Sequence, residues 1–244
     1  MQLKEASILV VDDEPVLLEI MGEWFQRNAA QVFCAANGVQ ALEILAIHKI
    51  DLIITDVRMA VMDGITLLRK VKANGLPTPS VILITGFADI DARDAYDLGA
   101  EALLEKPIDR DELLKVMQRS LLEPDKRWQK PVDLSAYPVL TRSFASLAAA
   151  LEEHRIAFGR GGFCIEAGQF REEGPLNIEL DFKADGYVLS GQGIVHWLAH
   201  QDDQLGIEFT YVTEASRARL IELVKAATSF IPRTTGRTYQ ALAG

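Results

Sequence analysis

Polar side chains with distinct chemistry follow four apolar runs in the first half of the sequence. Apolar and β-branched residues in a row predict strands buried on both faces, as in a parallel sheet. The residues that close or follow these runs are Asp12, Asp13, Asp56, Thr85, Glu105 and Lys106. Because the carboxyl ends of parallel strands meet at one edge of the sheet, we expect these side chains to converge there. Carboxylates, a hydroxyl and an ammonium at one edge could hold a hard cation and a phosphoryl group.

Asp56 is the candidate nucleophile of this set, because it closes the apolar run Leu52–Thr55. A carboxylate is a weak nucleophile. Phosphoryl transfer to it needs a cation that neutralises the phosphoryl charge and a second positive partner, for which Lys106 is the candidate. Ligation by oxygen alone favours Mg²⁺ over zinc. Any one of these polar residues could simply be a solvated strand end, but the whole set favours a site.

Five short sequence elements follow one another in this half: Val10–Pro15, Thr55–Met59, Met62–Gly64, Ile84–Gly86 and Glu105–Pro107. With these elements, residues 1–122 resemble the receiver domain (CheY-like) of a two-component response regulator. The resemblance implies that Asp56 accepts a phosphoryl group from a histidine kinase or a phosphotransfer protein. The implied Mg²⁺ site consists of Asp12, Asp13, Asp56 and the backbone carbonyl of Arg58. Thr85 and Lys106 would contact the phosphoryl oxygens, in a phosphoacceptor that dephosphorylates itself and is not a stand-alone enzyme.

Two positions depart from the receiver pattern. Leu103 stands where the family usually has Tyr or Phe, so the aromatic side chain that turns inward when Thr85 moves is missing. Ala60 replaces the usual proline in the loop after Asp56, which predicts a looser loop because no fixed φ remains. The pair Lys106–Pro107 keeps its family form, which implies a cis peptide bond.

Helical patterns separate the strands of this half. Apolar residues at helical spacing predict five helices, marked by Leu17–Trp24, Ala41–Leu45, Ile65–Val71, Ala92–Tyr96 and Leu113–Leu121. Gly75 and Pro77 are expected to end the third helix, and Gly99 the fourth. Strands that alternate with helices over this length predict an α/β doubly wound, five-stranded parallel sheet of the flavodoxin type.

The bulk composition predicts a globular chain of two domains. Its 244 residues exceed a typical domain of roughly 100 to 150. Hydrophobic residues make up 49% and charged residues 25%, and no apolar run is long enough to cross a bilayer. Cys34 and Cys164 lie in apolar surroundings that predict buried free thiols. With no signal-peptide pattern at the start, we expect a cytoplasmic protein without membrane insertion.

The net charge of −10 argues against DNA as a partner. Up to Leu122 there are 12 Lys and Arg against 19 Asp and Glu, and after it 13 against 16, so neither half is basic. DNA binding usually needs a positive surface, and no helix-turn-helix pattern or basic stripe follows Leu122. We therefore expect no DNA-binding output.

A polar segment with three prolines separates the two halves. Pro124, Pro131 and Pro138 interrupt regular structure, and Trp128 is the one large aromatic residue between them. We expect an ordinary solvated connector whose Trp128 docks on one domain. The predicted layout is a receiver domain at 1–122, a linker at 123–138, a second domain at 139–231 and a C-terminal tail at 232–244.

The second half changes from helical to strand periodicity. Apolar residues at helical spacing predict an amphipathic helix over Val139–Glu153. Alternation of apolar and polar residues then predicts strands over Leu176–Phe182, Val195–Ala199 and Leu205–Tyr211. A last helix is expected over Ala215–Phe230. Together these elements predict a small all-β antiparallel barrel with flanking helices.

Four glycine-containing elements of this half are Gly161–Ile165, Gly174–Ile178, Gly193–Trp197 and Leu205–Phe209. With the helix that follows them, they resemble a PilZ domain, a family best known for binding cyclic di-GMP. Its motif Asp/Asn-x-Ser-x-x-Gly aligns with Ala157–Gly162, where Ala157 and Gly159 replace the acceptor and the hydroxyl. Arg155 and Arg160 flank this turn as residual nucleotide-binding candidates. Because each lost charge-assisted contact is worth roughly 1.5 to 3 kcal/mol, tight binding is not expected.

We therefore expect a response regulator whose PilZ-like output acts by binding an unidentified downstream protein. The alternative is a cyclic di-GMP receptor whose affinity changes when the receiver is phosphorylated. The signal would leave through docking of the fourth helix and fifth strand, near Ala88 and Tyr96, on a second receiver or on the PilZ-like domain. A homodimer held constitutively by the helix face Leu140–Leu151 is the competing expectation. The four histidines lack metal-ligand spacing and are expected at surface or strand-end positions.

Overall fold

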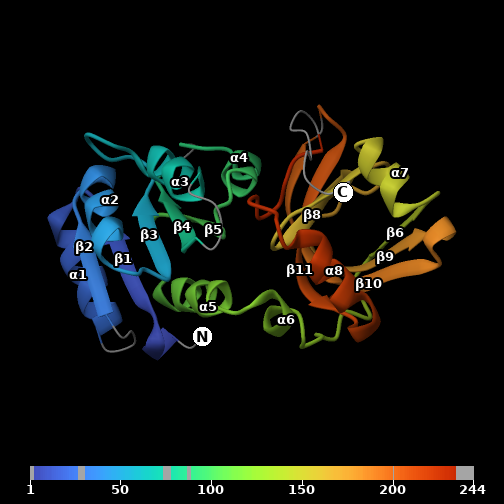
Figure 1. Cartoon of the computed structure of the whole chain (residues 1–244), viewed down its shortest axis with the longest axis horizontal. Helices are drawn as coiled ribbons and strands as arrows, with labels where there is room; N and C mark the ends of the chain where they lie inside the picture. The colour runs from blue at the N-terminus through green and yellow to red at the C-terminus, as the bar shows by residue number, and fades with distance from the viewer. Residues whose placement is uncertain (1–2, 27–30, 74–77, 87–88, 200, 235–244) are drawn as a thin grey trace. The chain divides into compact units, whose positions relative to one another are not determined.

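The computed structural model describes residues 3–26, 31–73, 78–86, 89–199 and 201–234 of the chain (Figure 1). The chain divides into two compact units, Met1–Glu123 and Pro124–Gly244. Within the described residues, no helix combines the length and the apolar character needed to span a membrane. The predicted end of the third helix at Gly75 and Pro77 lies outside the described residues.

Five parallel strands form the sheet of the first unit, in the order β2-β1-β3-β4-β5. They are β1 (Ser7–Val11), β2 (Gln31–Ala35), β3 (Leu52–Asp56), β4 (Ser80–Thr85) and β5 (Ala102–Glu105). Every residue of β3 is buried, as expected for a central strand covered on both faces. The predicted doubly wound parallel sheet of the flavodoxin type is confirmed, since this strand order is the flavodoxin order.

Helices cover both faces of this sheet. They are the short 3-10 turn η1 (Leu3–Glu5), α1 (Pro15–Gln26), α2 (Gly38–Ile47), α3 (Gly64–Ala73), α4 (Ala92–Asp97) and α5 (Arg110–Ser120). One core cluster contains Phe25 of α1 and Met117 of α5, and another contains Leu68 of α3 and Ala95 of α4. Side-chain oxygens of Asn37, Asp91 and Asp109 accept hydrogen bonds from the first turns of α2, α4 and α5.

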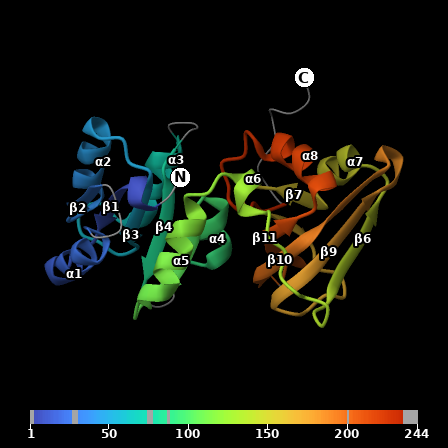
Figure 2. The same ribbon diagram turned by 90° about the horizontal axis from the view of Figure 1, so that it is seen from below.

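Six strands form the sheet of the second unit, in the order β6-β9-β10-β11-β8-β7 (Figure 2). They are β6 (Val139–Phe144), β7 (Ile156–Phe158), β8 (Gly162–Glu166), β9 (Gly174–Phe182), β10 (Tyr187–Ala199) and β11 (Gln204–Val212). The helical elements are α6 (Pro124–Arg127), α7 (Leu147–Glu152), the 3-10 turn η2 (Lys183–Asp185) and α8 (Glu214–Val224). The pairing of β6 with β9 is parallel and the other pairings are antiparallel, so the sheet is mixed. The prediction of a purely antiparallel arrangement is therefore wrong for β6.

The predicted helix over Val139–Glu153 is wrong in its first half. Residues of β6 alternate between solvent and core, with Leu140 and Phe144 buried. A spacing of four residues fits both one face of a strand and one face of a helix, so this pair could not separate the two. A short helix α7 follows, with Ser146 as its N-cap. The continuous helix face Leu140–Leu151, which was expected to hold a constitutive homodimer, therefore does not exist.

Three further expectations are corrected by the structure. The last helix ends at Val224, and residues 225–234 continue without helix. Cys34 is exposed, because it lies on the edge strand β2, whereas Cys164 in β8 is buried as predicted. Tyr96, which was expected near a docking surface, is only 4% exposed.

Trp128 joins the core of the second unit. Its ring is fully buried and lies edge-on to Phe209 at a centroid distance of 5.6 Å. Its carbonyl accepts a hydrogen bond of 3.1 Å from the backbone N–H of Val212. The segment predicted as a linker thus contains α6 and a core residue of the second unit, in line with the expected docking of Trp128.

Candidate functional site

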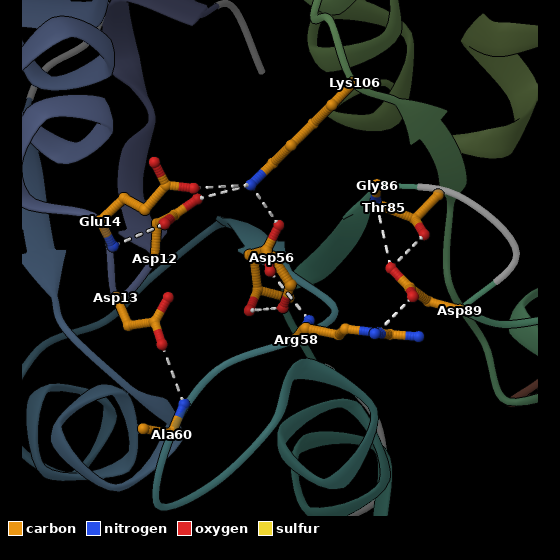
Figure 3. Close-up of polar contacts among 11 residues, drawn as sticks. Asp12, Asp13, Glu14, Asp56, Arg58, Ala60, Thr85, Gly86, Asp89 and Lys106 are labelled. Carbon is orange, nitrogen blue, oxygen red and sulfur yellow. Dashed lines mark hydrogen bonds and ion pairs between the residues drawn. The ribbon is translucent and has the colours of Figure 1, made fainter.

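The polar residues predicted at the strand ends lie at the carboxyl edge of the sheet in the first unit (Figure 3). Asp56 is the last residue of β3, Thr85 is the last residue of β4, and Lys106 directly follows β5. Asp12 and Thr85 are each 3% exposed and Asp56 is 6% exposed. The sheet therefore places buried carboxylates and a hydroxyl at one edge, although burying ionised carboxylates is unfavourable without partners.

Asp56 is held by one ammonium and one backbone donor. The ammonium of Lys106 lies 2.6 Å from Oδ1 of Asp56 and 3.4 Å from Oδ2 of Asp12. The other oxygen of Asp56, Oδ2, accepts a 2.8 Å hydrogen bond from the backbone N–H of Arg58. Asp12 accepts a bond of the same length from the N–H of Glu14. The contact with Lys106 compensates the two buried carboxylates, and the peptide bond from Lys106 to Pro107 is cis, as predicted.

The pKa values of the pair reflect opposing effects. Burial raises the pKa of Asp56, and the charge of Asp12 adds to this effect, while the contact with Lys106 lowers it in part. For Lys106, burial alone would lower the pKa of the ammonium, but the neighbouring Asp56 and Asp12 outweigh burial and raise it. Lys106 is therefore held in its charged form beside Asp56.

Glycine is required at position 64 by the backbone of Asp56. A Cβ at Gly64 would lie 2.1 Å from the carbonyl oxygen of Asp56, and the N–H of Gly64 donates to the carbonyl of Val57 at 3.0 Å. The loop that follows β3 thus turns back tightly on the end of that strand. This close approach gives a physical reason for the glycine in the element Met62–Gly64.

An open cleft of about 440 Å³ lies beside this loop. Its lining consists of Asp13, Val57, Arg58, Met59, Asp63, Ile65 and Asp89. The cleft therefore offers space next to the end of β3, on the side where Asp13 and Asp89 lie.

The donor set at this edge fits Mg²⁺ in its chemistry. Ionised Asp12, Asp13 and Asp56 offer only acceptor oxygens, which hard cations prefer. In the structure, however, Lys106 bridges Asp12 and Asp56, and Oδ2 of Asp13 accepts a 3.1 Å bond from the N–H of Ala60 (Figure 3). Over the described part of the chain, no group of three or more His, Cys, Asp or Glu side chains is arranged to hold a metal ion.

Ala60 has a role that a proline could not fill. Its backbone N–H is the donor to Asp13, and proline has no N–H. A looser loop was expected here because alanine lacks the fixed φ of proline. The structure shows that the same substitution adds a hydrogen bond that ties this loop to Asp13.

Thr85 points to a residue that the sequence did not single out. Its hydroxyl donates to Oδ2 of Asp89 at 2.9 Å, and the N–H of Gly86 donates to the same oxygen at 3.1 Å. The guanidinium of Arg58 forms an ion pair with Oδ1 of Asp89. The hydrogen bond from Thr85 is the main cause that lowers the pKa of Asp89, and Arg58 acts in the same direction. The sequence carries no signal for Asp89 beyond its position four residues after Thr85.

The turn aligned with the cyclic di-GMP motif is covered by the chain itself. Residues 228–234, which we call the C-terminal strap, lie against the turn between β7 and β8. The N–H groups of Gly161 and Gly162 donate to the carbonyl of Phe230 at 3.0 and 3.1 Å. A Cβ at Gly159 would lie 2.5 Å from that same oxygen, and Phe230 itself is 1% exposed. The glycine at position 159 therefore admits the strap where the family motif has serine.

The structure does not bring Arg155 and Arg160 together. Arg155 precedes β7 and Arg160 follows it, so they lie at opposite ends of this strand. Arg155 lies 3.6 Å from the carboxylate of Glu166 and covers the ring of Phe144. Arg160 donates to the carbonyl of Thr228 in the strap at 3.3 Å. Each arginine thus already contacts other parts of the second unit.

His196 is the exception to the expected surface positions of the histidines. Its Nε2 lies 2.7 Å from a carboxylate oxygen of Glu208, whose side chain is fully buried. Both residues belong to neighbouring strands, β10 and β11. Sequence alternation placed Glu208 on the polar face of its strand, so this buried pair was missed. His200 lies outside the described residues.

The fold and the strand-end residues of the first unit define a receiver domain of the response regulator class. Residues 8–118 match the family model described as the response regulator receiver domain. Over 116 residues the chain is 34% identical to sporulation initiation phosphotransferase F of Bacillus subtilis. The alignment covers 47% of this chain and 93% of that protein. The chain belongs to the response regulator receiver family.

Two further matches cover this part of the chain or a little more. The transcriptional regulatory protein GlrR of Escherichia coli is 33% identical over 149 residues, which cover 58% of this chain and 33% of GlrR. The chain thus spans about a third of that curated relative. Among solved structures, a signal receiver domain of an HD domain-containing protein from Pseudomonas fluorescens is 31% identical, covers 48% of this chain and 94% of that chain, and has a TM-score of 0.45.

Proposed function

We propose that the chain is a response regulator in which Asp56 accepts a phosphoryl group from a histidine kinase or a phosphotransfer protein. The observation that carries this proposal is the contact of 2.6 Å between Asp56 and Lys106 at the carboxyl edge of a receiver sheet. It places a positive group beside a buried carboxylate whose second oxygen is also held.

The residues of the site have separate tasks in this transfer. An oxygen of Asp56 attacks phosphorus, and the bond from phosphorus to the donor nitrogen or oxygen breaks as the acyl phosphate forms. Lys106 neutralises the negative charge on the oxygens of the phosphoryl group being transferred, and Thr85 donates a hydrogen bond to one of them. Asp13, Asp56 and the Arg58 carbonyl, with Asp12 beside them, would hold Mg²⁺. When bound, Mg²⁺ would neutralise phosphoryl charge and align the group.

Labelling by a small phosphodonor tests this proposal. Acetyl phosphate with Mg²⁺ is expected to phosphorylate the wild-type chain but not Asp56→Ala. The matched control is Glu105→Gln, because Glu105 is also a carboxylate at the end of a strand of the same sheet but is exposed. It is expected to label like the wild type. Equal labelling of Asp56→Ala and wild type would reject Asp56 as the acceptor.

For the second unit we propose a PilZ-like output that acts by binding a downstream protein. Its support is the resemblance of four glycine-containing elements and the passage from β11 directly into α8. Several relatives of the receiver part are named transcriptional regulatory proteins, but the second half of this chain carries no basic excess that would favour DNA. Protein binding is the output that the acidic composition permits most readily.

Cyclic di-GMP is the alternative ligand, and the C-terminal strap argues against it. The strap accepts hydrogen bonds from Gly161 and Gly162 in the turn that aligns with the nucleotide motif, and it also accepts one from Arg160. Calorimetric titration of the dinucleotide into the full chain is expected to give no binding heat. Binding at micromolar concentration or tighter would favour the alternative function as a nucleotide receptor.

A further inference from the structure

Asp89 receives three donors from the two loops that flank the phosphoacceptor. Thr85 is the last residue of β4, Gly86 directly follows it, and Arg58 belongs to the loop after β3. The hydroxyl of Thr85 and the N–H of Gly86 share Oδ2, while Arg58 pairs with Oδ1. The side chain of Asp89 is only 5% exposed. The carboxylate of Asp89 therefore lies between the loop after β3 and the end of β4, and hydrogen bonds and an ion pair connect it to both.

The hydrogen bond from Thr85 to Asp89 prevents the same hydroxyl from donating to a second acceptor. A threonine hydroxyl has a single proton to donate, and in this structure it is donated to Asp89. Thr85 is 3% exposed, so water cannot easily replace a lost partner. A phosphoryl group on Asp56 would need the same proton for one of its oxygens. Asp89 and the phosphoryl group are both anionic acceptors, and they compete for one donor.

We propose that Asp89 is a positioning residue that holds the unphosphorylated state by taking the hydroxyl of Thr85. This inference rests on the proposed phosphorylation of Asp56. Phosphorylation and the Asp89 contact are then linked, because each can form fully only when the other has released Thr85. Arg58 pairs with the other oxygen of Asp89, so the loop after β3 and the end of β4 meet at this carboxylate.

The linkage predicts that removal of the Asp89 carboxylate favours the loaded state. Beryllofluoride with Mg²⁺ serves as the probe, and bound fluoride is observed by fluorine NMR. Asp89→Ala and Asp89→Asn are expected to raise the affinity for beryllofluoride by about fivefold, which is the size of a typical net hydrogen bond. Asp89→Asn keeps the shape of the side chain and serves if the alanine variant folds poorly.

Two controls separate this role from a merely structural one. Asp91→Ala removes the N-cap of α4 two residues away, whose oxygen accepts from the N–H of Arg93 and does not contact Thr85. It is expected to leave the affinity unchanged. In a Thr85→Ala background, where no hydroxyl remains to compete for, the Asp89→Ala substitution is expected to give no gain.

The outcomes distinguish the inference from the proposed function. If the wild type shows no bound fluoride, the proposed function fails, and the role of Asp89 falls with it. If the wild type is loaded but both Asp89 variants bind no more tightly than the wild type, only the role of Asp89 is rejected. A gain that persists in the Thr85→Ala background would also reject it, because the effect would not pass through the hydroxyl.

Discussion

Each unit contains a segment that aligns with the ligand-site pattern of a family, but the two segments differ in their local structure. At the sheet edge of the first unit, Asp56 and Lys106 are in direct contact and line up with the receiver pattern. At the turn between β7 and β8 of the second unit, Ala157 and Gly159 stand in the polar positions of the aligned motif, and the C-terminal strap lies against the turn. A sequence motif indicates a site when the chemically active side chains are present. Where only the spacing of the motif is present, the small residues at its positions can instead allow another part of the chain to pack there.

The largest expected effect concerns Phe230, the buried phenylalanine of the C-terminal strap. Phe230 is almost fully buried, and its ring would touch a Cβ placed on Gly161. Phe230→Ala is expected to lower the free energy of unfolding of the second unit by about 3 kcal/mol, since a buried phenylalanine leaves a large cavity. Thermal and urea unfolding followed by circular dichroism measure this loss.

Phe170→Ala is the matched control, because Phe170 is a phenylalanine of the same unit that is only partly buried against its core. It should destabilise the unit less than Phe230→Ala. Equal destabilisation by both variants would mean that the strap contributes no special packing to this turn.

The next effect concerns the ammonium at the receiver site. Lys106→Ala is expected to slow labelling by acetyl phosphate by about 100-fold, the usual loss when one preorganised charge partner is removed. Lys106 lowers the pKa of Asp56 against the effect of burial, so in the variant this pKa rises further. Because the nucleophile must be ionised, part of the labelling rate should return as the pH is raised.

Lys115→Ala is the control for charge, since Lys115 is an exposed lysine on α5. It should label at the wild-type rate and with the wild-type pH dependence. A Lys106→Ala variant that labels like the Lys115→Ala variant would contradict the assignment of Lys106 to the phosphoryl group.

A third experiment restores the missing nucleotide motif. The double substitution Ala157→Asp and Gly159→Ser recreates its side chains, but a Cβ at position 159 would lie 2.7 Å from the carbonyl oxygen of Ser229. The variant is expected to be less stable by about 1 to 3 kcal/mol, as for other overpacked sites, and to gain no affinity for cyclic di-GMP. Calorimetry showing new binding would mean that the strap is displaced easily.

The smallest expected effect is the change in docking when the receiver is loaded. Leu103, which stands where the family usually has an aromatic residue, is partly buried and packs against the core. We expect loading of the receiver to act instead through a shift of α4 and β5. A coupling of about 1 to 3 kcal/mol would suffice to change the sedimentation coefficient or the hydrogen exchange over residues 92–121 on addition of beryllofluoride. No change in either quantity would argue against this route. Ala88, which was also expected there, lies outside the described residues.

The sequence predicted the receiver fold well because its signals are local and redundant. The fully buried β3 and the turns around Asp56 combine strand pattern, helix pattern and strand-end chemistry in one short segment. The contact of Asp89 with Thr85 was not predictable, because four residues of loop can place a side chain in many directions.

In the second unit the missing information is long-range. Leu140 and Phe144 fit a helix and a strand equally well, and β6 is fixed only by its pairing with β9, more than 30 residues away. The strap reaches the turn at Gly159 from about 70 residues further along the chain, as in the bond between Arg160 and Thr228. Such contacts leave no periodic pattern in the sequence.

Location of the phosphoryl group tests the central claim most directly. After treatment with acetyl phosphate and Mg²⁺, reduction of the acyl phosphate with borohydride converts a phosphorylated aspartate to homoserine, which peptide mass spectrometry can place in the chain. We expect the conversion at Asp56 alone, in a peptide that contains the end of β3. Conversion at another aspartate, or no conversion in a folded wild-type chain, would contradict the assignment of Asp56 as the phosphoacceptor.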